Sequence, residues 1–297
     1  MLPSKDLEIY GIRKIRSGKV RDLFSWKNEL WMVTSDRLSA FDYILPDEIP
    51  AKGIILNQIA LGWFEKTSLI CPNALLSEEL PEGVELPEWE ARLMRVLPCD
   101  PLPVEFIVRG YLVGGGWKQY VEKGIVGDYS IPKNLAYGSP LPEPLFTPTT
   151  KAREGHDQPL DEKTAKNILG DNYERLKTLA LNLYLHGKNY ALKKGLILLD
   201  TKFEFGIRDG KIYLIDELIT PDSSRFWLSE EFERDKTACA HYDKQIVRDY
   251  LEKIGWNQQP PIPRLSQQII KEMQQRYKEV LSRLFPERLK KVTALID

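Results

Sequence analysis

The first hundred residues show the short alternations of apolar and polar positions that are typical of β-strands. Residues 15–26 and 29–40 combine apolar and β-branched side chains with turn-forming residues, and residues 91–97 form a further strand-like run. Residues 56–67 follow a different pattern, a spacing of three to four positions that predicts a helix. The positions that mark this helix are Ile59, Trp63 and Lys66.

A group of prolines follows these strands. Pro98, Pro101 and Pro103 lie close together, and proline does not continue a central strand. We therefore expect an extended hinge between two domains, a β-rich domain over residues 1–103 and an α+β domain over residues 104–297. A chain of 297 residues is long enough for this division, since a domain has roughly 150 residues.

The second predicted domain begins with residues 104–120, which indicate a strand, a glycine-rich turn and a helix. Residues 128–159 are rich in proline and polar side chains, so we expect a long loop there.

Two long helices are predicted in the rest of the chain. The first covers residues 162–194, and Gly195 is a natural residue to end it. The second starts near Ser266, a good N-cap, and Pro286 lies just beyond its end. The positions expected to be buried are Ile168, Leu176, Leu179, Leu183 and Tyr190 in the first helix, and Ile269, Met273, Tyr277, Val280 and Leu284 in the second.

The charge balance limits the class of partner. The net charge is −1, so no global basic field is present to bind nucleic acid. No apolar run approaches the roughly 18 residues of a membrane span, and the first residues lack the apolar core of a secretory signal. We therefore expect a cytoplasmic protein that binds neither nucleic acid nor a membrane.

The cysteines and histidines limit the metal chemistry. The three cysteines include no C-x-x-C pair, and their odd number argues against a disulfide framework. The three histidines are far apart, which makes a zinc site from local spacing improbable. A metal would then be a hard cation bound by carboxylates, and we expect Mg²⁺.

The most informative segment, residues 195–227, contains two strands that flank a turn at Asp209 and Gly210. With a two-residue loop, Phe203 would pair with Asp216. Side chains alternate along a strand, so Glu204 and Asp216 would then lie on opposite faces.

A three-residue loop over residues 208–210 would pair Lys202 with Asp216 instead, and would place Glu204 opposite Leu214. We expect this register, because it gathers one ammonium and two carboxylates on one face. Such a set suits a magnesium-bound triphosphate, in which carboxylates bind the metal and lysine neutralises the phosphoryl group. The alternative is a solvated face with a cross-strand ion pair. The other face would be a core face of Phe203, Phe205, Tyr213 and Ile215.

Other segments offer further candidates. Gly18 and Lys19 lie between two strands, where the backbone amides and the lysine could approach phosphates, although an ordinary hairpin turn explains them as well. Arg109 ends an apolar strand just before three glycines at positions 114–116, whose amides could form an anion site at a helix N-terminus. Arg225 follows a turn and could bind a phosphate or carboxylate with two hydrogen bonds.

Two polar loops complete the candidates. Asp36 lies in a polar segment, residues 35–42, for which a turn or capping role is favoured over a site. Lys151 and His156 lie in the predicted long loop, where a histidine is usually exposed.

Taken together, these segments resemble one family, the SAICAR synthetases of purine biosynthesis. Seven stretches occur in family order from about residue 16 to residue 251. They are SGKVRDLF, SDRLSAFDYILPDEIPAKGIILNQIALGWF, VEFIVRGYLVGGGWKQY, FTPTTKAREGHD, DTKFEFG, DELITPDSSRFW and YDKQIVRDYL.

The resemblance implies an ATP-dependent ligase. The family joins a carboxylated aminoimidazole ribotide, CAIR, to L-aspartate and cleaves ATP to ADP and phosphate. It implies an α+β fold of two lobes built on antiparallel sheets, a kinase-like N-terminal lobe and a larger, ATP-grasp-like C-terminal lobe, with ATP between them. A monomer or small homo-oligomer is expected. The chemistry suggests an acyl phosphate of CAIR that the aspartate amine attacks.

The resemblance also implies roles for single residues. Residues 100–104 would meet adenine through their backbone. Lys202, Arg109 and Arg225 are expected to be catalytic. The residues expected to bind ATP are Gly18, Lys19, Arg21, Lys202 and Glu204; those expected to bind substrate are Arg109, Gly115, Ser224, Arg225 and Asp36; and those expected to bind Mg²⁺ are Glu204 and Asp216.

The sequence departs from the family pattern in two places. The family often has serine where Gly115 stands, and glycine offers only its amide. The stretch TKAREGHD is one residue shorter than the commoner form, which affects roles for Arg153, Glu154 and His156. The alternatives to the ligase are a small-molecule kinase on the same lobe and a non-enzymatic nucleotide sensor.

Overall fold

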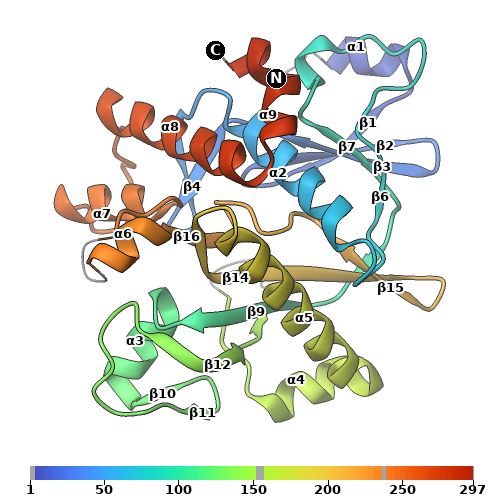
Figure 1. Ribbon diagram of the computed structural model, residues 1–297. Helices are drawn as coiled ribbons and strands as arrows, with labels where there is room; N and C mark the ends of the chain where they lie inside the picture. The colour runs from blue at the N-terminus through green and yellow to red at the C-terminus, as the bar shows by residue number, and fades with distance from the viewer. Residues whose placement is uncertain (1–3, 152–156, 236–238, 297) are drawn as a thin grey trace. The chain divides into compact units, whose positions relative to one another are not determined.

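The computed structural model describes residues 4–151, 157–235 and 239–296, which form two compact units (Figure 1). Unit 1 contains residues 1–65, 73–100 and 244–297, and unit 2 contains residues 66–72 and 101–243. The C-terminal segment that begins at Lys244 therefore belongs, by its contacts, to the same unit as the N-terminal residues. The functional division at residues 103 and 104 stays a prediction.

The described residues of unit 1 form a five-stranded antiparallel sheet and a separate two-stranded one. The larger sheet has the order β1 (Arg13–Ser17), β2 (Arg21–Trp26), β3 (Glu29–Thr34), β7 (Leu93–Val96) and β6 (Leu75–Ser77), and the smaller one pairs β4 (Arg37–Ala40) with β5 (Tyr43–Glu48). Trp31 and Trp89 meet edge to face in the core beside this sheet, with ring centroids 6.1 Å apart. The strands predicted in residues 15–40 and 91–97 are thus present.

Helices complete unit 1. They are α1 (Ser4–Ile9), α2 (Lys52–Thr67), the short 3-10 helix η1 (Pro87–Trp89), α7 (Gln245–Lys253), α8 (Gln267–Leu284) and α9 (Pro286–Ile296). The predicted helix of residues 56–67 is α2, which buries Ile59 and Trp63 completely and leaves Lys66 exposed.

The end of the chain differs from the prediction in one respect. Ser266 caps α8 as expected, since its hydroxyl accepts a hydrogen bond from the Ile269 amide. Pro286 does not merely follow the last helix; it starts another, α9. Proline is well suited to a first helical position, because its fixed φ is helical and its missing N–H has no partner there anyway. The buried face of α8 is Ile270, Met273, Tyr277, Val280, Leu281 and Leu284.

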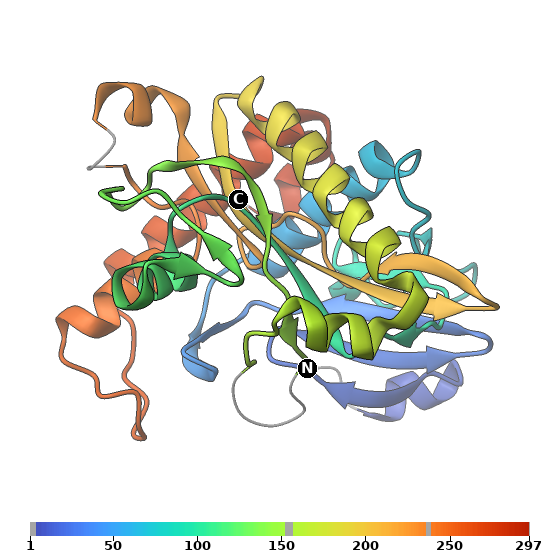
Figure 2. The ribbon, with the colours of Figure 1, turned by 90° about the horizontal axis from the view of Figure 1, so that it is seen from below.

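Unit 2 is built on a larger sheet. Its described strands are β12 (Pro140–Phe146), β9 (Val104–Tyr111), β14 (Leu196–Arg208) and β15 (Lys211–Ile215) in this order, with β13 (Thr149–Thr150) beside β9, and β8 (Asp100–Pro101) and β16 (Ser224–Leu228) beside β14. A small hairpin pairs β10 (Ile125–Val126) with β11 (Tyr129–Ser130). The helices are α3 (Gly114–Lys123), α4 (Glu162–Leu169), the 3-10 turn η2 (Gly170–Asn172), α5 (Tyr173–Leu192) and α6 (Ser229–Arg234). Figures 1 and 2 show α5 running along β14, which it contacts together with β9.

Two predictions for unit 2 are wrong in part. Residues 128–159 are not one loop, because they contain β12 and β13. Residues 162–194 form two helices, because Gly170 adopts a positive φ of 55° between α4 and α5. Ile168 is therefore 41% exposed instead of lying on a continuous buried stripe. Gly195 has a φ of 75° just after α5, as expected of the residue that ends a helix.

The α+β class with antiparallel sheets is confirmed. In the described parts of the chain, no helix combines the length and apolar character that crossing a membrane requires.

Candidate active site

The hairpin of β14 and β15 has the register that we did not expect. Arg208 pairs with Lys211, so the loop has two residues, Asp209 and Gly210, and the predicted three-residue loop is wrong. Both loop residues have positive φ, 50° and 71°, which matches the type I′ turn that the twist of a hairpin favours. Glu204 consequently faces Ile215 and not Leu214.

The buried face of the hairpin is also different. Phe203 and Phe205 are buried, as expected, but their neighbours from β15 are Ile212 and Leu214. Tyr213 and Ile215, predicted in the core, lie partly exposed on the face that carries Glu204.

The charge of Asp216 nevertheless influences the ionisable side chains on the face that carries Glu204. The ladder ends at Ile215, and Asp216 takes a left-handed backbone conformation with a φ of 63°. Alternation along the strand no longer sets the direction of its side chain. Burial raises the pKa of Glu204 and the charge of Asp216 raises it further; the pKa of Lys202 is raised mainly by Glu105, with Asp216 as the smallest contribution. Asp216 therefore belongs to the same electrostatic environment.

Five ionisable side chains form this cluster, which we call the acidic cluster: Glu105, Lys151, Lys202, Glu204 and Asp216. Lys202 donates to Glu105 across β14 and β9, and Lys151 donates to Glu204. Burial would lower the pKa of Lys202, but the neighbouring carboxylates, Glu105 first, raise it above the usual value. Burial and then the charge of Asp216 raise the pKa of Glu204, with Lys151 and Lys202 acting in the opposite direction.

Glu204 and Asp216 fit a divalent cation. Burial and the charge of Asp216 disfavour the ionised form of Glu204, and a cation beside the two carboxylates would stabilise it. Among the described residues, no group of three or more His, Cys, Asp and Glu side chains could hold a metal unaided. A cation bound by this pair would need further oxygen ligands, as Mg²⁺ takes from phosphates and water.

A second cluster, which we call the arginine clamp, surrounds Asp200 on β14. Asp200 faces Arg109 on β9 and Arg225 on β16. Its Oδ2 accepts hydrogen bonds from Nη1 of Arg109 at 2.9 Å and from Nη1 of Arg225 at 2.6 Å. Nε of Arg109 also donates to the Thr147 hydroxyl at 3.0 Å. One carboxylate thus serves two partly buried guanidinium groups. Burial lowers the pKa of Arg225, but the charge of Asp200 and then that of the buried Asp243 raise it.

The predicted glycine turn lies against these guanidinium groups. A Cβ atom on Gly114 would be 2.4 Å from Arg225 Nη2, and one on Gly115 would be 3.7 Å from Arg109 Nη2. The same three glycines begin α3, and no side-chain cap is found at this N-terminus among the described residues. Helix N-terminal amides and two guanidinium groups together make a site for an anion.

Ser224 lies beside the clamp but points elsewhere. Its hydroxyl donates to the Thr201 hydroxyl at 2.8 Å, and both residues are buried. A direct role in substrate binding stays a prediction for this residue.

The candidates of unit 1 form a compact turn between β1 and β2. The Gly18 amide donates to the Arg21 carbonyl at 2.7 Å, and Lys19 forms an ion pair with Asp42. Arg37 stabilises the turn, because Nη2 donates to the Gly18 carbonyl at 3.1 Å and Nε donates to the Lys19 carbonyl at 3.2 Å. Lys19 is half exposed, whereas Arg21 is buried. The predicted ATP contacts of this turn stay predictions.

Asp36 has a structural role that the sequence suggested as an alternative. Both of its oxygens accept hydrogen bonds from Arg92, at 2.6 and 2.9 Å, and Oδ1 also accepts from the Gly53 amide in the first turn of α2, at 2.7 Å. These contacts describe a helix cap with a bidentate ion pair. They leave substrate binding by Asp36 as a prediction. His156 lies outside the described residues.

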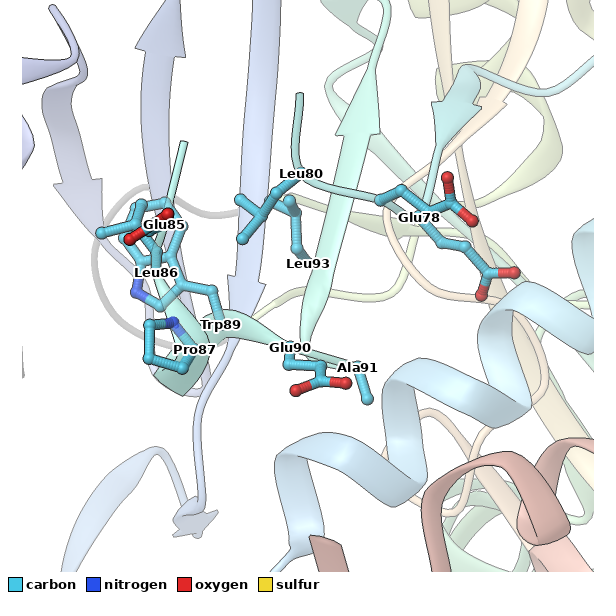
Figure 3. A pocket seen from close by; sticks show the side chains of 10 residues that line it. Glu78, Leu80, Glu85, Leu86, Pro87, Trp89, Glu90, Ala91 and Leu93 are labelled. Carbon is cyan, nitrogen blue, oxygen red and sulfur yellow. The ribbon is translucent and has the colours of Figure 1, made fainter. Parts of the chain in front are cut away.

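Unit 1 also contains a pocket of about 510 Å³ beside η1 (Figure 3). The figure shows an apolar group that includes Trp89 and Leu86, with glutamate side chains around it. The negative charge of these glutamates repels phosphate, so this pocket does not suit a nucleoside triphosphate. Its lining residues are Glu78, Glu79, Leu80, Glu85, Leu86, Pro87, Trp89, Glu90, Ala91 and Leu93.

Comparison with known proteins identifies the family. The family model of SAICAR synthetase matches residues 14–263. A phosphoribosylaminoimidazole-succinocarboxamide synthase of Thermodesulfovibrio yellowstonii is 46% identical over 283 residues, which cover 93% of this chain and 96% of the relative. The chain belongs to the SAICAR synthetase family.

Solved structures of SAICAR synthetases agree. The Saccharomyces cerevisiae SAICAR synthase, solved in complex with SAICAR, is 34% identical with a TM-score of 0.81 and covers 93% of this chain and 95% of that one. A SAICAR synthetase solved in complex with ADP is 24% identical with a TM-score of 0.67, covers 91% of this chain and 97% of that one, and shows a shared fold. The predicted family, and with it an enzyme of the SAICAR synthase type in purine biosynthesis, is confirmed.

Sequence reasoning missed the central residue of the clamp in this SAICAR synthetase. No role was predicted for Asp200, the first residue of the stretch DTKFEFG. The signal was its spacing, because Asp200, Lys202 and Glu204 alternate along one strand and therefore share a face. The same signal was present on β9, where Glu105 and Arg109 also lie on one face. Thr147, which orients Arg109, gave no signal, because it lies far from the arginine in sequence.

From the ion pairs of the arginine clamp we predict an effect on the free energy of unfolding. Asp200→Asn removes the charge that pairs with Arg109 and Arg225, and should lower the free energy of unfolding of this SAICAR synthetase by about 3 kcal/mol, as expected when a buried ion pair loses one partner. Asp209→Asn at the exposed tip of the hairpin is the matched control, with an effect of less than about 0.5 kcal/mol. Urea denaturation measures both, and equal stabilities would contradict a buried ion pair at Asp200.

Proposed function

We propose that this SAICAR synthetase joins CAIR to L-aspartate with cleavage of ATP, giving SAICAR, ADP and phosphate. The observation that carries the proposal is the placement of the arginine clamp and the acidic cluster on one face of β14. Asp200, Lys202 and Glu204 alternate along the strand, so the two clusters are about 7 to 13 Å apart. An anion site beside a cation site on one rigid strand suits a ribotide phosphate next to a metal-bound triphosphate.

The arginine clamp is the proposed site of the ribotide phosphate. Arg109 and Arg225 share the hydrogen bonds of one carboxylate, so the guanidinium N–H groups that do not donate to it would donate to a phosphate. The amides at the start of α3 add neutral donors, and Gly115 contributes here through its amide alone. The complex of the yeast relative with SAICAR supports a site for this class of ligand.

The acidic cluster is the proposed site of the triphosphate and of Mg²⁺. Glu204 and Asp216 would hold the cation, and Lys202 would contact the phosphates. Mg²⁺, when bound, would offset the negative charge of the phosphates. The ATP contacts expected of Gly18, Lys19 and Arg21 rest on the family resemblance alone.

The chemistry explains why ATP is needed. A carboxylate does not form an amide directly, because oxide is a poor leaving group. In the proposed route, an oxygen of the CAIR carboxylate accepts the terminal phosphoryl group of ATP, and ADP leaves. The neutral amine of aspartate then attacks the carbonyl carbon, loses a proton, and expels phosphate. Lys202, held by Glu105, stays charged and stabilises the phosphoryl group during transfer.

Aspartate-dependent product formation tests the proposed function. With CAIR, ATP and Mg²⁺ present, the protein should release ADP and form SAICAR at the same rate, and both should require L-aspartate for repeated turnover. Product chromatography and a coupled ADP assay measure the two. A stable phosphorylated product with no need for aspartate would show a small-molecule kinase instead.

The metal assignment predicts the effect of two further substitutions. Glu204→Gln and Asp216→Asn should each lower kcat by about 10²-fold or more, because each removes a charge that the cation needs. Both variants should keep the parent's circular dichroism and bind Mn²⁺, used as a probe for Mg²⁺, more weakly in equilibrium titrations. Asp209→Asn, on the same hairpin, should match the parent. Near-normal turnover in both variants would remove the assignment.

The phosphate assignment predicts a selective effect on CAIR. Arg225→Ala should raise the KM for CAIR about 10- to 100-fold and leave the KM for ATP within about twofold, since one charge-assisted contact contributes about 1.5–3 kcal/mol. Arg234→Ala, an exposed arginine of the same unit, is the control and should change neither value. A change confined to the KM for ATP would contradict this role.

A further inference from the structure

Tyr184 is a buried residue of α5 with no part in the motifs of the family resemblance. It is fully buried, and its hydroxyl donates to the carbonyl of Leu198 at 2.9 Å and contacts that of Leu199 at 3.4 Å. Burial raises the pKa of Tyr184 well above its ordinary value, so the hydroxyl keeps its proton and remains a donor. Both carbonyls immediately precede Asp200 of the arginine clamp.

The two carbonyls lie where β14 departs from regular pairing with β16. Leu198 faces Phe226, but Asp200 faces Arg225, so β14 advances two residues while β16 advances one. Leu199 is therefore the extra residue of a β-bulge. An extra residue of this kind has no regular partner in the ladder with β16. The Tyr184 hydroxyl secures the backbone at this point, because it donates to the carbonyl of Leu198 just before the bulge and contacts the carbonyl of Leu199 itself.

The bulge decides whether the clamp can form. If the pairing of Leu198 with Phe226 continued without interruption, Asp200 would face Ser224 and Arg225 would face Leu199. A slip of one residue moves a side chain to the other face of a sheet. Arg225 and Asp200 would then point to opposite faces, and their ion pair would be lost.

The neighbouring strand leaves space for the same hydroxyl. Asp200 faces Arg109 on β9, so Gly110 is the next residue along this strand. A Cβ atom on Gly110 would lie 1.9 Å from the Tyr184 hydroxyl oxygen and 2.8 Å from its Cζ. Only glycine at this position permits the tyrosine to reach the bulge between the strands that carry the two arginines.

We propose that Tyr184 is a positioning residue for the ribotide phosphate site, because its hydroxyl holds the β-bulge at Leu199 that turns Asp200 toward both Arg109 and Arg225. Tyr184 does not touch the substrate and acts through Asp200. This inference rests on the proposed function, since it assumes that the arginine clamp binds the phosphate of CAIR.

The test is Tyr184→Phe, which removes the hydroxyl and keeps the ring. Loss of one buried hydrogen bond should loosen the bulge and raise the KM for CAIR about tenfold, together with the dissociation constant of CAIR in calorimetry. The KM for ATP and kcat should stay within about twofold of the parent. Gly110→Ala, which displaces the hydroxyl without removing it, should produce the same selective rise.

Tyr173→Phe is the matched control. Tyr173 begins the same helix and is buried, and no hydrogen bond of its hydroxyl is found among the described residues. This variant should keep the parent's KM for CAIR. Thermal melting shows whether each variant is folded.

The outcomes separate the two proposals. A folded Tyr184→Phe protein with the parent's KM for CAIR, or with equal changes in both KM values, would overturn the positioning role. Should Tyr184→Phe fail to fold, Gly110→Ala decides by the same criterion. If Arg225→Ala also leaves the KM for CAIR unchanged, the phosphate assignment itself fails. If Arg225→Ala raises it and Tyr184→Phe does not, only the role of Tyr184 fails.

Discussion

The register of β14 with β9 and β16 is the constraint on which the site of unit 2 depends. Only one alignment places Asp200 between Arg109 and Arg225, and a bulge on one side is needed to reach it. Burying charged groups is costly unless they are paired, so this alignment is strongly favoured over a slipped one. The same register then sets the positions of Lys202 and Glu204, two and four residues further along the strand.

The two clusters on this strand differ in composition. The arginine clamp has two guanidinium groups that share the carboxylate of Asp200, and the charge of the buried Asp243 also acts on Arg225. The acidic cluster, with all groups ionised, has three carboxylates and two ammonium groups, an excess of one negative charge. A phosphate ester and a divalent cation are the natural complements of these two sites, and the strand holds them at a fixed spacing. Preorganisation of this kind avoids rearranging charge during the reaction.

Part of this site could be predicted from the sequence, although the hairpin register that supported the prediction was wrong. Charge on one face of a hairpin brought Lys202 and Glu204 together, as the structure has them, and their roles stay predictions. The three-residue loop was wrong, because Asp-Gly forms a tighter turn, and Asp216 joins the charged face through a left-handed backbone that alternation cannot anticipate.

The bulge at Leu199 and the contact of Tyr184 depend on packing between distant segments, so no local pattern reveals them. Pro286 was interpreted as a residue beyond the last helix, whereas the structure starts α9 with it, and Gly170 divides the single helix predicted over residues 162–194.

A crystal structure of the protein with CAIR bound tests the central claim most directly. The account predicts the ribotide phosphate within about 3 Å of the guanidinium groups of both Arg109 and Arg225, with the first amides of α3 as further donors. Asp200 should remain between the two arginines on the bulged strand. A phosphate bound elsewhere, with neither guanidinium group in contact with it, would contradict the account.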